Sequence, residues 1–127
     1  MSHDAIVRTA DGKFRQTVTL GEHVLVSDEP RDVGGDDAGP PPHDLLLAAL
    51  GSCTSMTMKM YADRKGWPLQ ACEVTVSMSK QGDATTLHRK IVLTGPLDDD
   101  QRTRILEIAR KCPVHKTLSG AIAIADL

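Results

Sequence analysis

Aromatic side chains are almost missing from this sequence of 127 residues, which contains one Trp, one Tyr and one Phe. A hydrophobic core must therefore be built from aliphatic and methionine side chains. The length suits one domain, and we expect residues 1–127 to form it. Because a domain of this size buries only about two-thirds of its unfolded surface, we expect a second copy of the chain to complete the core in a homodimer.

The sequence also has no strong excess of charge of one sign, since 15 Lys and Arg stand against 17 Asp and Glu. No basic stripe with interleaved aromatics is present, which argues against a nucleic-acid partner. No apolar run approaches the roughly 18 residues of a membrane span, and the first residues lack the pattern of a secretion signal. We therefore expect no membrane partner and a cytoplasmic location.

Cysteine is scarce too, with three residues and no pair in the CxxC spacing. An odd number of cysteines without a secretion signal argues against a framework of structural disulfides. Redox or metal chemistry at individual cysteines stays open.

Turn dipeptides divide the first part of the chain. Asp11-Gly12 and Gly21-Glu22 separate strand-like runs and are typical of tight hairpins. The pattern predicts strands over residues 5–10, 13–20 and 23–28. Residues 29–41 are rich in Gly, Pro and Asp and predict a loop, which leads into a long apolar segment.

That segment, residues 42–66, is predicted to be one long helix. Pro42 and Asp44 suit its beginning, and Gly66 and Pro68 suit its end. Spacings of three and four residues predict a buried stripe, made of Leu46, Ala49, Leu50, Cys53, Met56, Thr57 and Met60.

The second part of the chain predicts a hairpin and a further helix. Residues 72–78 alternate between apolar and polar, and residues 85–94 return as a second strand after a Gly-Asp turn. An acidic entrance at 97–100 leads into a predicted helix at 101–111, with an inward face of Ile105, Leu106, Ile108 and Ala109. Residues 114–120 suit a short turn, and 121–125 (AIAIA) suit a last strand.

Two cysteines have surroundings that suggest chemistry. Cys53 lies in the middle of the apolar helix, and Cys112 lies among cations that favour the reactive thiolate, namely Arg110, Lys111, His115 and Lys116. A thiol peroxidase needs one thiol that attacks the peroxide and a second that resolves the sulfenic acid as a disulfide. Cys72 alternates with valines on a strand and is interpreted as a packing residue.

The attacking thiolate also needs a cation, because burial alone would raise the pKa of the thiol. The polar residues that could approach Cys53 are His43 and Asp44, together with Arg15 or Arg31. Arginine serves best because it stays charged and donates to both sulfur and peroxide oxygen.

Two other kinds of site are less well supported. Cys112 and His115 with Cys53 and His43 could nominally supply four ligands to Zn²⁺, but without a CxxC pair we expect no metal and no cofactor. A serine hydrolase is disfavoured because Ser52 lacks the second glycine of a nucleophile elbow.

The two cysteine contexts, LLLAALGSCT and ARKCPVHKTL, resemble in combination the OsmC/Ohr family of osmotically inducible and organic hydroperoxide resistance proteins, specifically its short OsmC-like branch. The resemblance implies an α+β fold in which antiparallel sheets wrap around a long central helix in an intertwined homodimer. It further implies reduction of organic hydroperoxides, with Cys53 as the peroxidatic and Cys112 as the resolving cysteine. The implied reductant is a dithiol of the lipoyl type.

The sequence departs from the family pattern before the first cysteine. Typical members place a Glu ten residues earlier to orient an arginine, which we expect to be Arg15, with Arg8 as the next choice. Here that position is His43, and Asp44 is offset by one residue, or about 100° around a helix. The departure favours an alternative, a non-peroxidatic relative that binds a small hydrophobic or thiol-reactive ligand at the dimer interface, with its cysteines acting as a redox sensor.

Overall fold

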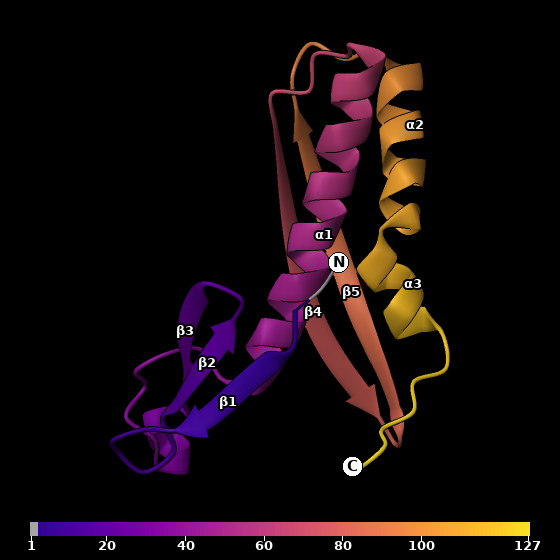
Figure 1. The fold of residues 1–127 in the computed structure, drawn as a ribbon. Coiled ribbons are helices and arrows are strands. Elements are labelled where there is room, and N and C mark those ends of the chain that lie inside the picture. Colours follow the sequence, from indigo (N-terminus) through magenta and orange to yellow (C-terminus); the bar gives the residue numbers. More distant parts are fainter. Residues whose placement is uncertain (1–2) are drawn as a thin grey trace. The chain divides into compact units, whose positions relative to one another are not determined.

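The computed structural model describes residues 3–127, and the chain forms two compact units that divide between Leu46 and Leu47. In the first unit β1 (Ala5–Thr9), β2 (Gln16–Leu20) and β3 (His23–Ser27) form an antiparallel sheet in the order β1-β2-β3 (Figure 1). These are the three strands predicted from the turn dipeptides, although β2 begins three residues later than predicted.

The loop after β3 is irregular, as predicted, but it is held by one side chain. The buried carboxylate of Asp28 accepts hydrogen bonds from the backbone N–H groups of Glu29 at 2.8 Å, Asp36 at 3.3 Å and Ala38 at 3.1 Å. The loop also contains a single 3₁₀ turn, η1 (Arg31–Val33). One anionic group thus satisfies several backbone donors that a loop leaves without partners.

The long helix α1 (Pro42–Lys65) begins and ends where the sequence predicts. Gly66 follows it with a φ of 69°, a left-handed conformation that glycine adopts without strain. The Gly66 N–H bonds to the carbonyl oxygen of Asp63, and the Trp67 N–H bonds to that of Ala62. This pair of bonds closes the helix end and turns the chain back.

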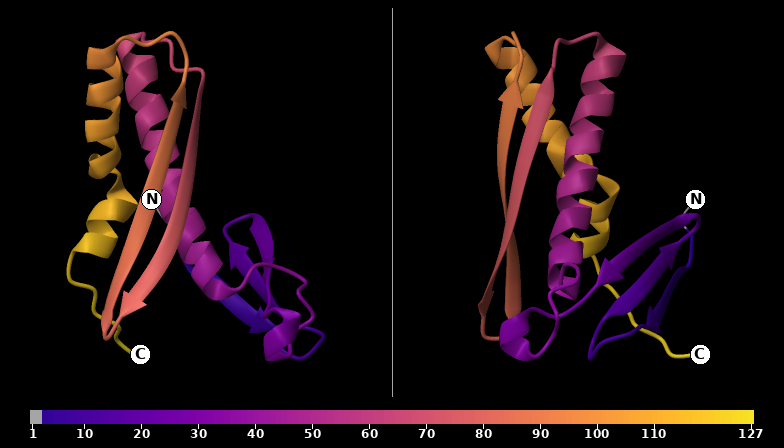
Figure 2. Two further views of the ribbon diagram at one scale, coloured as in Figure 1. Left: turned by 180° about the vertical axis from the view of Figure 1, so that it is seen from behind. Right: turned by 90° about the vertical axis from the view of Figure 1, so that its left-hand side faces the viewer.

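The second unit is built on a hairpin of β4 (Ala71–Gln81) and β5 (Ala84–Thr94), which pair antiparallel as predicted. The helices α1 and α2 (Asp99–Ile108) lie side by side against this hairpin (Figure 2). A capping box between Asp98 and Gln101 starts α2. The 3₁₀ turn η2 (Ala109–Lys111) and the short helix α3 (Pro113–Ser119) follow.

The core of the second unit is aliphatic and rich in methionine and alanine, as the lack of aromatics predicts. Its buried members come from both helices and the chain after α1, namely Met58, Ala62, Leu69, Ile105 and Ala109. Inward-facing residues of the hairpin pack against them. The predicted alternation of β4 is confirmed, because Cys72 and Val74 are half-buried while Glu73 and Thr75 are exposed.

The predicted stripe of α1 is correct only in part: Leu50 is buried and Cys53 and Thr57 are half-buried, but Leu46, Ala49, Met56 and Met60 are exposed. The residues that the helix buries are spaced by four, namely Leu50, Thr54, Met58 and Ala62. Met56 and Met60, which were predicted to be buried, are each 63% exposed. The helix is apolar on neighbouring faces, so periodicity does not tell which face the hairpin and α2 cover.

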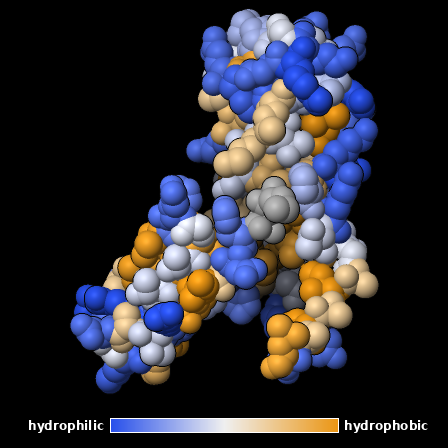
Figure 3. All heavy atoms as spheres, in the orientation of Figure 1, coloured by the Kyte–Doolittle hydropathy of each residue, from blue (hydrophilic) through white to orange (hydrophobic). Residues whose placement is uncertain are grey.

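Two predictions for the last third of the chain also need correction. Leu106 was placed inward but is 42% exposed, whereas Ile105, Ile108 and Ala109 are buried as predicted. Residues 121–125 form no strand, and hydrophobic side chains of this segment lie at the surface (Figure 3). Alternation alone does not make a strand, because the backbone needs a hydrogen-bonded neighbour, and none pairs with this segment among residues 3–127.

Candidate functional site

The two reactive cysteines of the prediction come together in the second unit at the start of α3. Cys112 is the N-cap residue of α3, and its Sγ accepts a hydrogen bond from the backbone N–H of His115 at 3.2 Å. The preceding N–H, that of Val114, donates to Sγ of Cys53 on α1 at 3.5 Å. Two consecutive amides of one short segment therefore hold the two sulfurs.

The two thiols differ in access. Both are free, but Cys112 is fully buried with 0% exposure, whereas Cys53 is half-buried. A molecule that approaches from solvent therefore reaches the sulfur of Cys53 before that of Cys112.

A polar network from α1, β5 and α3 adjoins Cys112. The Thr54 hydroxyl, fully buried, lies 3.8 Å from Sγ of Cys112 and 2.7 Å from the carbonyl oxygen of Leu50. Nη1 of Arg89, from β5, donates to the Thr54 hydroxyl at 3.0 Å and to the Ala109 carbonyl oxygen at 3.2 Å. Its Nη2 lies 2.8 Å from Nδ1 of His115. One guanidinium thus connects α1, η2 and α3.

The protein shifts the pKa values of the two thiols in opposite directions. Burial raises the pKa of Cys53, and the neighbouring Cys112 raises it further. The hydrogen bond from the Val114 N–H lowers this pKa but does not cancel the rise. Burial also opposes ionisation of Cys112, but hydrogen bonds from the His115 N–H, the Cys53 thiol and the Thr54 hydroxyl together place its pKa below the usual value. Of the two thiols, Cys112 therefore gives up its proton more readily than Cys53.

A cavity of about 300 Å³ adjoins this network. Arg89 and His115 line it together with apolar and hydroxyl-bearing residues, namely Leu50, Thr85, Thr86, Leu87, Leu118 and Ser119. The volume is at the lower end of the range for pockets that bind small molecules. Neither cysteine lines the cavity, and Arg89 and His115 are the residues that it shares with the network around Cys112.

The remaining residues of the predicted site belong to the first unit. His43 and Asp44 are exposed in the first turn of α1, and Arg8 is exposed on β1. Arg15 is half-buried, and its Nε is buried without a hydrogen-bond partner among residues 3–127. Their roles at the site stay predictions, as does that of the exposed Arg31.

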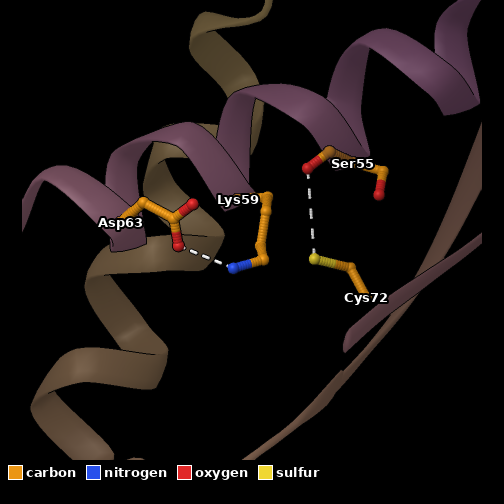
Figure 4. A network of polar contacts seen from close by, with 4 residues as sticks. All are labelled: Ser55, Lys59, Asp63 and Cys72. Atoms are coloured by element: carbon orange, nitrogen blue, oxygen red, sulfur yellow. Dashed lines mark hydrogen bonds and ion pairs between the residues drawn. The ribbon is translucent and has the colours of Figure 1, made fainter. Parts of the chain in front are cut away.

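The third cysteine, Cys72, takes no part in this cluster. It lies on β4 and its Sγ points to the carbonyl oxygen of Ser55 at 4.0 Å, near the ion pair of Lys59 and Asp63 (Figure 4). Its half-buried position against the core agrees with the packing role inferred from the alternating strand.

No group of three or more His, Cys, Asp or Glu side chains lies close enough to hold a metal ion in the part of the chain that the structure describes. Within residues 3–127, likewise, no helix has the length and apolarity needed to cross a membrane.

Arg89 and Thr54 were missed by the sequence analysis. Arg89 carried a signal, because in the run 87–93 it occupies an inward position that is otherwise apolar. A charge at such a position is costly to bury unless it has partners, and so marks a polar site. Thr54 carried no comparable signal, since it directly follows the cysteine in a helix of small residues.

The fold is α+β, and its site is a pair of free cysteines held by one segment and flanked by an arginine. Residues 34–125 match the family model described as OsmC-like protein, so the chain belongs to the OsmC-like family. This confirms the resemblance seen in the two cysteine contexts.

Solved structures of this family share the fold. An OsmC-like protein from Mycoplasma pneumoniae is 19% identical with a TM-score of 0.73, covering 93% of this chain and 87% of that one. The organic hydroperoxide resistance protein OsmC of Legionella pneumophila is 21% identical with a TM-score of 0.64, over 93% and 90% of the two chains. The organic hydroperoxide resistance protein OhrB of Bacillus subtilis is 21% identical with a TM-score of 0.61, over 92% and 91%. A comparison with curated proteins gives no match.

Proposed function

We propose that this protein is a thiol-dependent peroxidase that reduces organic hydroperoxides through Cys53 and Cys112. The observation that carries the proposal is the pair of consecutive N–H groups, of Val114 and His115, that bind the two sulfurs. Disulfide formation needs two thiols that can approach each other, and this segment holds both. The similarity to two proteins named for organic hydroperoxide resistance supports the choice of substrate class.

Access favours Cys53 as the cysteine that attacks. A hydroperoxide can meet the half-buried Cys53, whereas Cys112 is enclosed. The Cys53 sulfur attacks the distal oxygen of the hydroperoxide, the O–O bond breaks, and the alcohol leaves. Cys53 is then a sulfenic acid, and Cys112 displaces its oxygen to form the disulfide.

The cycle closes when a dithiol reduces the disulfide. The lipoyl-type dithiol stays a prediction from the family resemblance, and so do the cation role of Arg15 and the replacement of the missing glutamate by His43 or Asp44. The apolar part of the cavity, formed by Leu50, Leu87 and Leu118, suits an organic group better than hydrogen peroxide.

Peroxide consumption with dihydrolipoamide tests the proposal. The protein should consume cumene hydroperoxide faster than hydrogen peroxide, Cys53→Ser should abolish consumption, and Cys112→Ser should stop after one turnover with the sulfenic acid trapped. Cys72→Ser is the control and should keep its activity. Mass spectrometry after one equivalent of peroxide should find a peptide in which Cys53 is joined to Cys112. Absence of turnover with every dithiol would overturn the peroxidase.

The cavity also supports a second candidate, a protein that binds a small hydrophobic or thiol-reactive ligand and uses the cysteines as a redox sensor. Its volume of about 300 Å³ and mixed lining suit such a ligand. In that case peroxide should form the Cys53 to Cys112 disulfide once, without turnover, and the disulfide should change ligand affinity.

A further inference from the structure

Arg89 is a half-buried cation without an anionic partner among the described residues. The ion pairs of residues 3–127 join Lys59 to Asp63 and Arg104 to Glu107, and neither includes Arg89. We propose that Arg89 is a positioning residue that fixes Thr54 and His115 against Cys112, so that Cys112 is kept as a thiolate and takes the proton of Cys53 when Cys53 attacks. This inference deepens the proposed function and rests on it.

The guanidinium of Arg89 bonds to three elements at once. Its three bonds, at 2.8 to 3.2 Å, reach a hydroxyl on α1, a carbonyl oxygen of η2 and an imidazole on α3. A planar fork with donors on separate nitrogens can make these bonds at the same time, whereas the three donors of a lysine ammonium all lie on one nitrogen. Arg89 therefore fixes the positions of α1, η2 and α3 around Cys112.

The Thr54 hydroxyl lies between Arg89 and Cys112. The hydroxyl has one proton and two acceptors, the carbonyl oxygen of Leu50 and Sγ of Cys112. Arg89 donates to the hydroxyl oxygen and so makes its proton a stronger donor. A thiolate accepts a hydrogen bond more strongly than a thiol, so the polarised hydroxyl stabilises the charged form of Cys112.

The groups that face Cys112 come from α1, β5, η2 and α3. Cys53 faces it from α1, Arg89 acts from β5 and His115 from α3, while Arg110 and Lys111 are exposed on the adjoining η2. None of these groups is a carboxylate. The hydrogen bonds to Cys112 and the cations of Arg89, Arg110 and Lys111 therefore favour a negative sulfur, against its burial, which opposes the charge.

A thiolate at Cys112 gives a balanced proton path. Cys53 passes its proton to the Cys112 thiolate and attacks the distal oxygen of the hydroperoxide, and the alkoxide that leaves takes this proton from Cys112 and departs as the alcohol. Cys112 is again a thiolate and attacks the sulfur of the sulfenic acid. Hydroxide leaves and is protonated by solvent, and the two sulfurs are joined in the disulfide.

Titration of Cys112 tests the inference without any peroxide. In the Cys53→Ser, Cys72→Ser chain Cys112 is the only thiol, and the serine introduced on α1 keeps a hydroxyl donor beside it. The thiolate absorbance, measured as a function of pH, reports the ionisation of Cys112. The same chain with Cys112→Ser added has no thiol and gives the baseline. Arg89→Gln should raise the titration midpoint by about one pH unit, which is about a tenfold fall in the ratio of thiolate to thiol at a given pH. Arg89→Lys should raise it less. Lys90→Gln, which removes an exposed charge one residue along β5, should leave it unchanged.

Equal midpoints for Arg89→Gln and Lys90→Gln would overturn the inference. If Arg89→Gln does not fold, the comparison of Thr54→Val with Thr54→Ser tests the inference instead, because only the valine removes the hydroxyl. The valine should raise the Cys112 midpoint and the serine should not, and equal midpoints would again overturn it. If the protein shows no peroxidase turnover but the Cys112 midpoint shifts as expected, the role of Arg89 stands and only the proposed function is overturned.

Discussion

Nη2 of Arg89 lies 2.8 Å from Nδ1 of His115. A guanidinium can only donate, so Nδ1 must accept and carries no proton. The neutral ring then has its proton on Nε2. Burial lowers the pKa of His115, and the positive charges of Arg89 and Arg110 lower it further. His115 is therefore a neutral member of the site at neutral pH.

The first prediction concerns the titration of His115. We expect its imidazole, followed by NMR, to take up a proton at lower pH than a histidine in an unfolded peptide. Arg89→Gln removes a neighbouring positive charge and should raise the His115 pKa, whereas Lys90→Gln should not. If Arg89→Gln leaves the pKa of His115 unchanged, Arg89 does not bond to Nδ1 of His115 in solution.

The same shift makes stability depend on pH with a definite sign. Because the folded pKa of His115 is below its unfolded value of about 6.5, the folded state binds fewer protons between the two values. The stabilisation is fully present above pH of about 6.5 and is lost as the pH falls through the folded pKa. Denaturant unfolding at a series of pH values should show a smaller acid loss in His115→Gln than in the unaltered protein.

The second prediction compares neighbouring residues of α2. Ile105 is fully buried and Leu106 is 42% exposed, although the sequence pattern placed both inward. Ile105→Ala should lower the free energy of unfolding by about 2 to 5 kcal/mol because it leaves a cavity between α1 and α2. Leu106→Ala should cost less than about 1 kcal/mol. Similar losses in urea unfolding would mean that Leu106 is covered in solution.

This pair of residues shows how far the sequence determines the fold. Turn dipeptides and alternation give the strands and the hairpin because glycine turns and a half-buried face leave local signals. The face of a helix depends on what packs against it, which is a property of distant segments. For this reason Met56 and Met60 were misplaced, and a strand was predicted at 121–125 where no neighbouring strand pairs with it.

The site was predictable to a similar degree. Cys53 and Cys112 stood out through their cationic and small-residue surroundings, and the structure brings them together. Arg89 lies more than twenty residues from either cysteine along the chain, so no local spacing connects it with them. Only the pairing of β4 with β5 and the packing of α1 on this hairpin bring its guanidinium to Thr54.

The third prediction concerns the loop of the first unit. The N–H of Ala38, then those of Glu29 and Asp36, lower the pKa of Asp28 against the effect of its burial, with help from the charge of Arg15. The loop should therefore be most stable above the unfolded carboxyl pKa and should loosen as the pH falls through the folded value.

Hydrogen exchange is the measurement for this loop. Asp28→Ala should speed exchange at the amides of Asp36 and Ala38, whose acceptor it removes. Asp28→Asn keeps one oxygen and should have a smaller effect. Asp32→Asn is the control, because Asp32 is exposed in η1 and should leave both amides protected. Equal protection in all three variants would contradict the role of Asp28.

The fourth prediction concerns the homodimer, which we propose to form through the exposed apolar face of α1. Met56 and Met60 are each 63% exposed on the part of this helix that belongs to the second unit, and water contact over such a face is unfavourable. Light scattering should give twice the chain mass of 13.7 kDa for the unaltered protein. Met60→Lys places a charge in the proposed interface and should shift the mass to that of one chain, whereas Leu106→Lys places the same charge on an exposed apolar site of α2 and should not. A single-chain mass for the unaltered protein, or a dimer that survives Met56→Lys and Met60→Lys together, would rule out this interface.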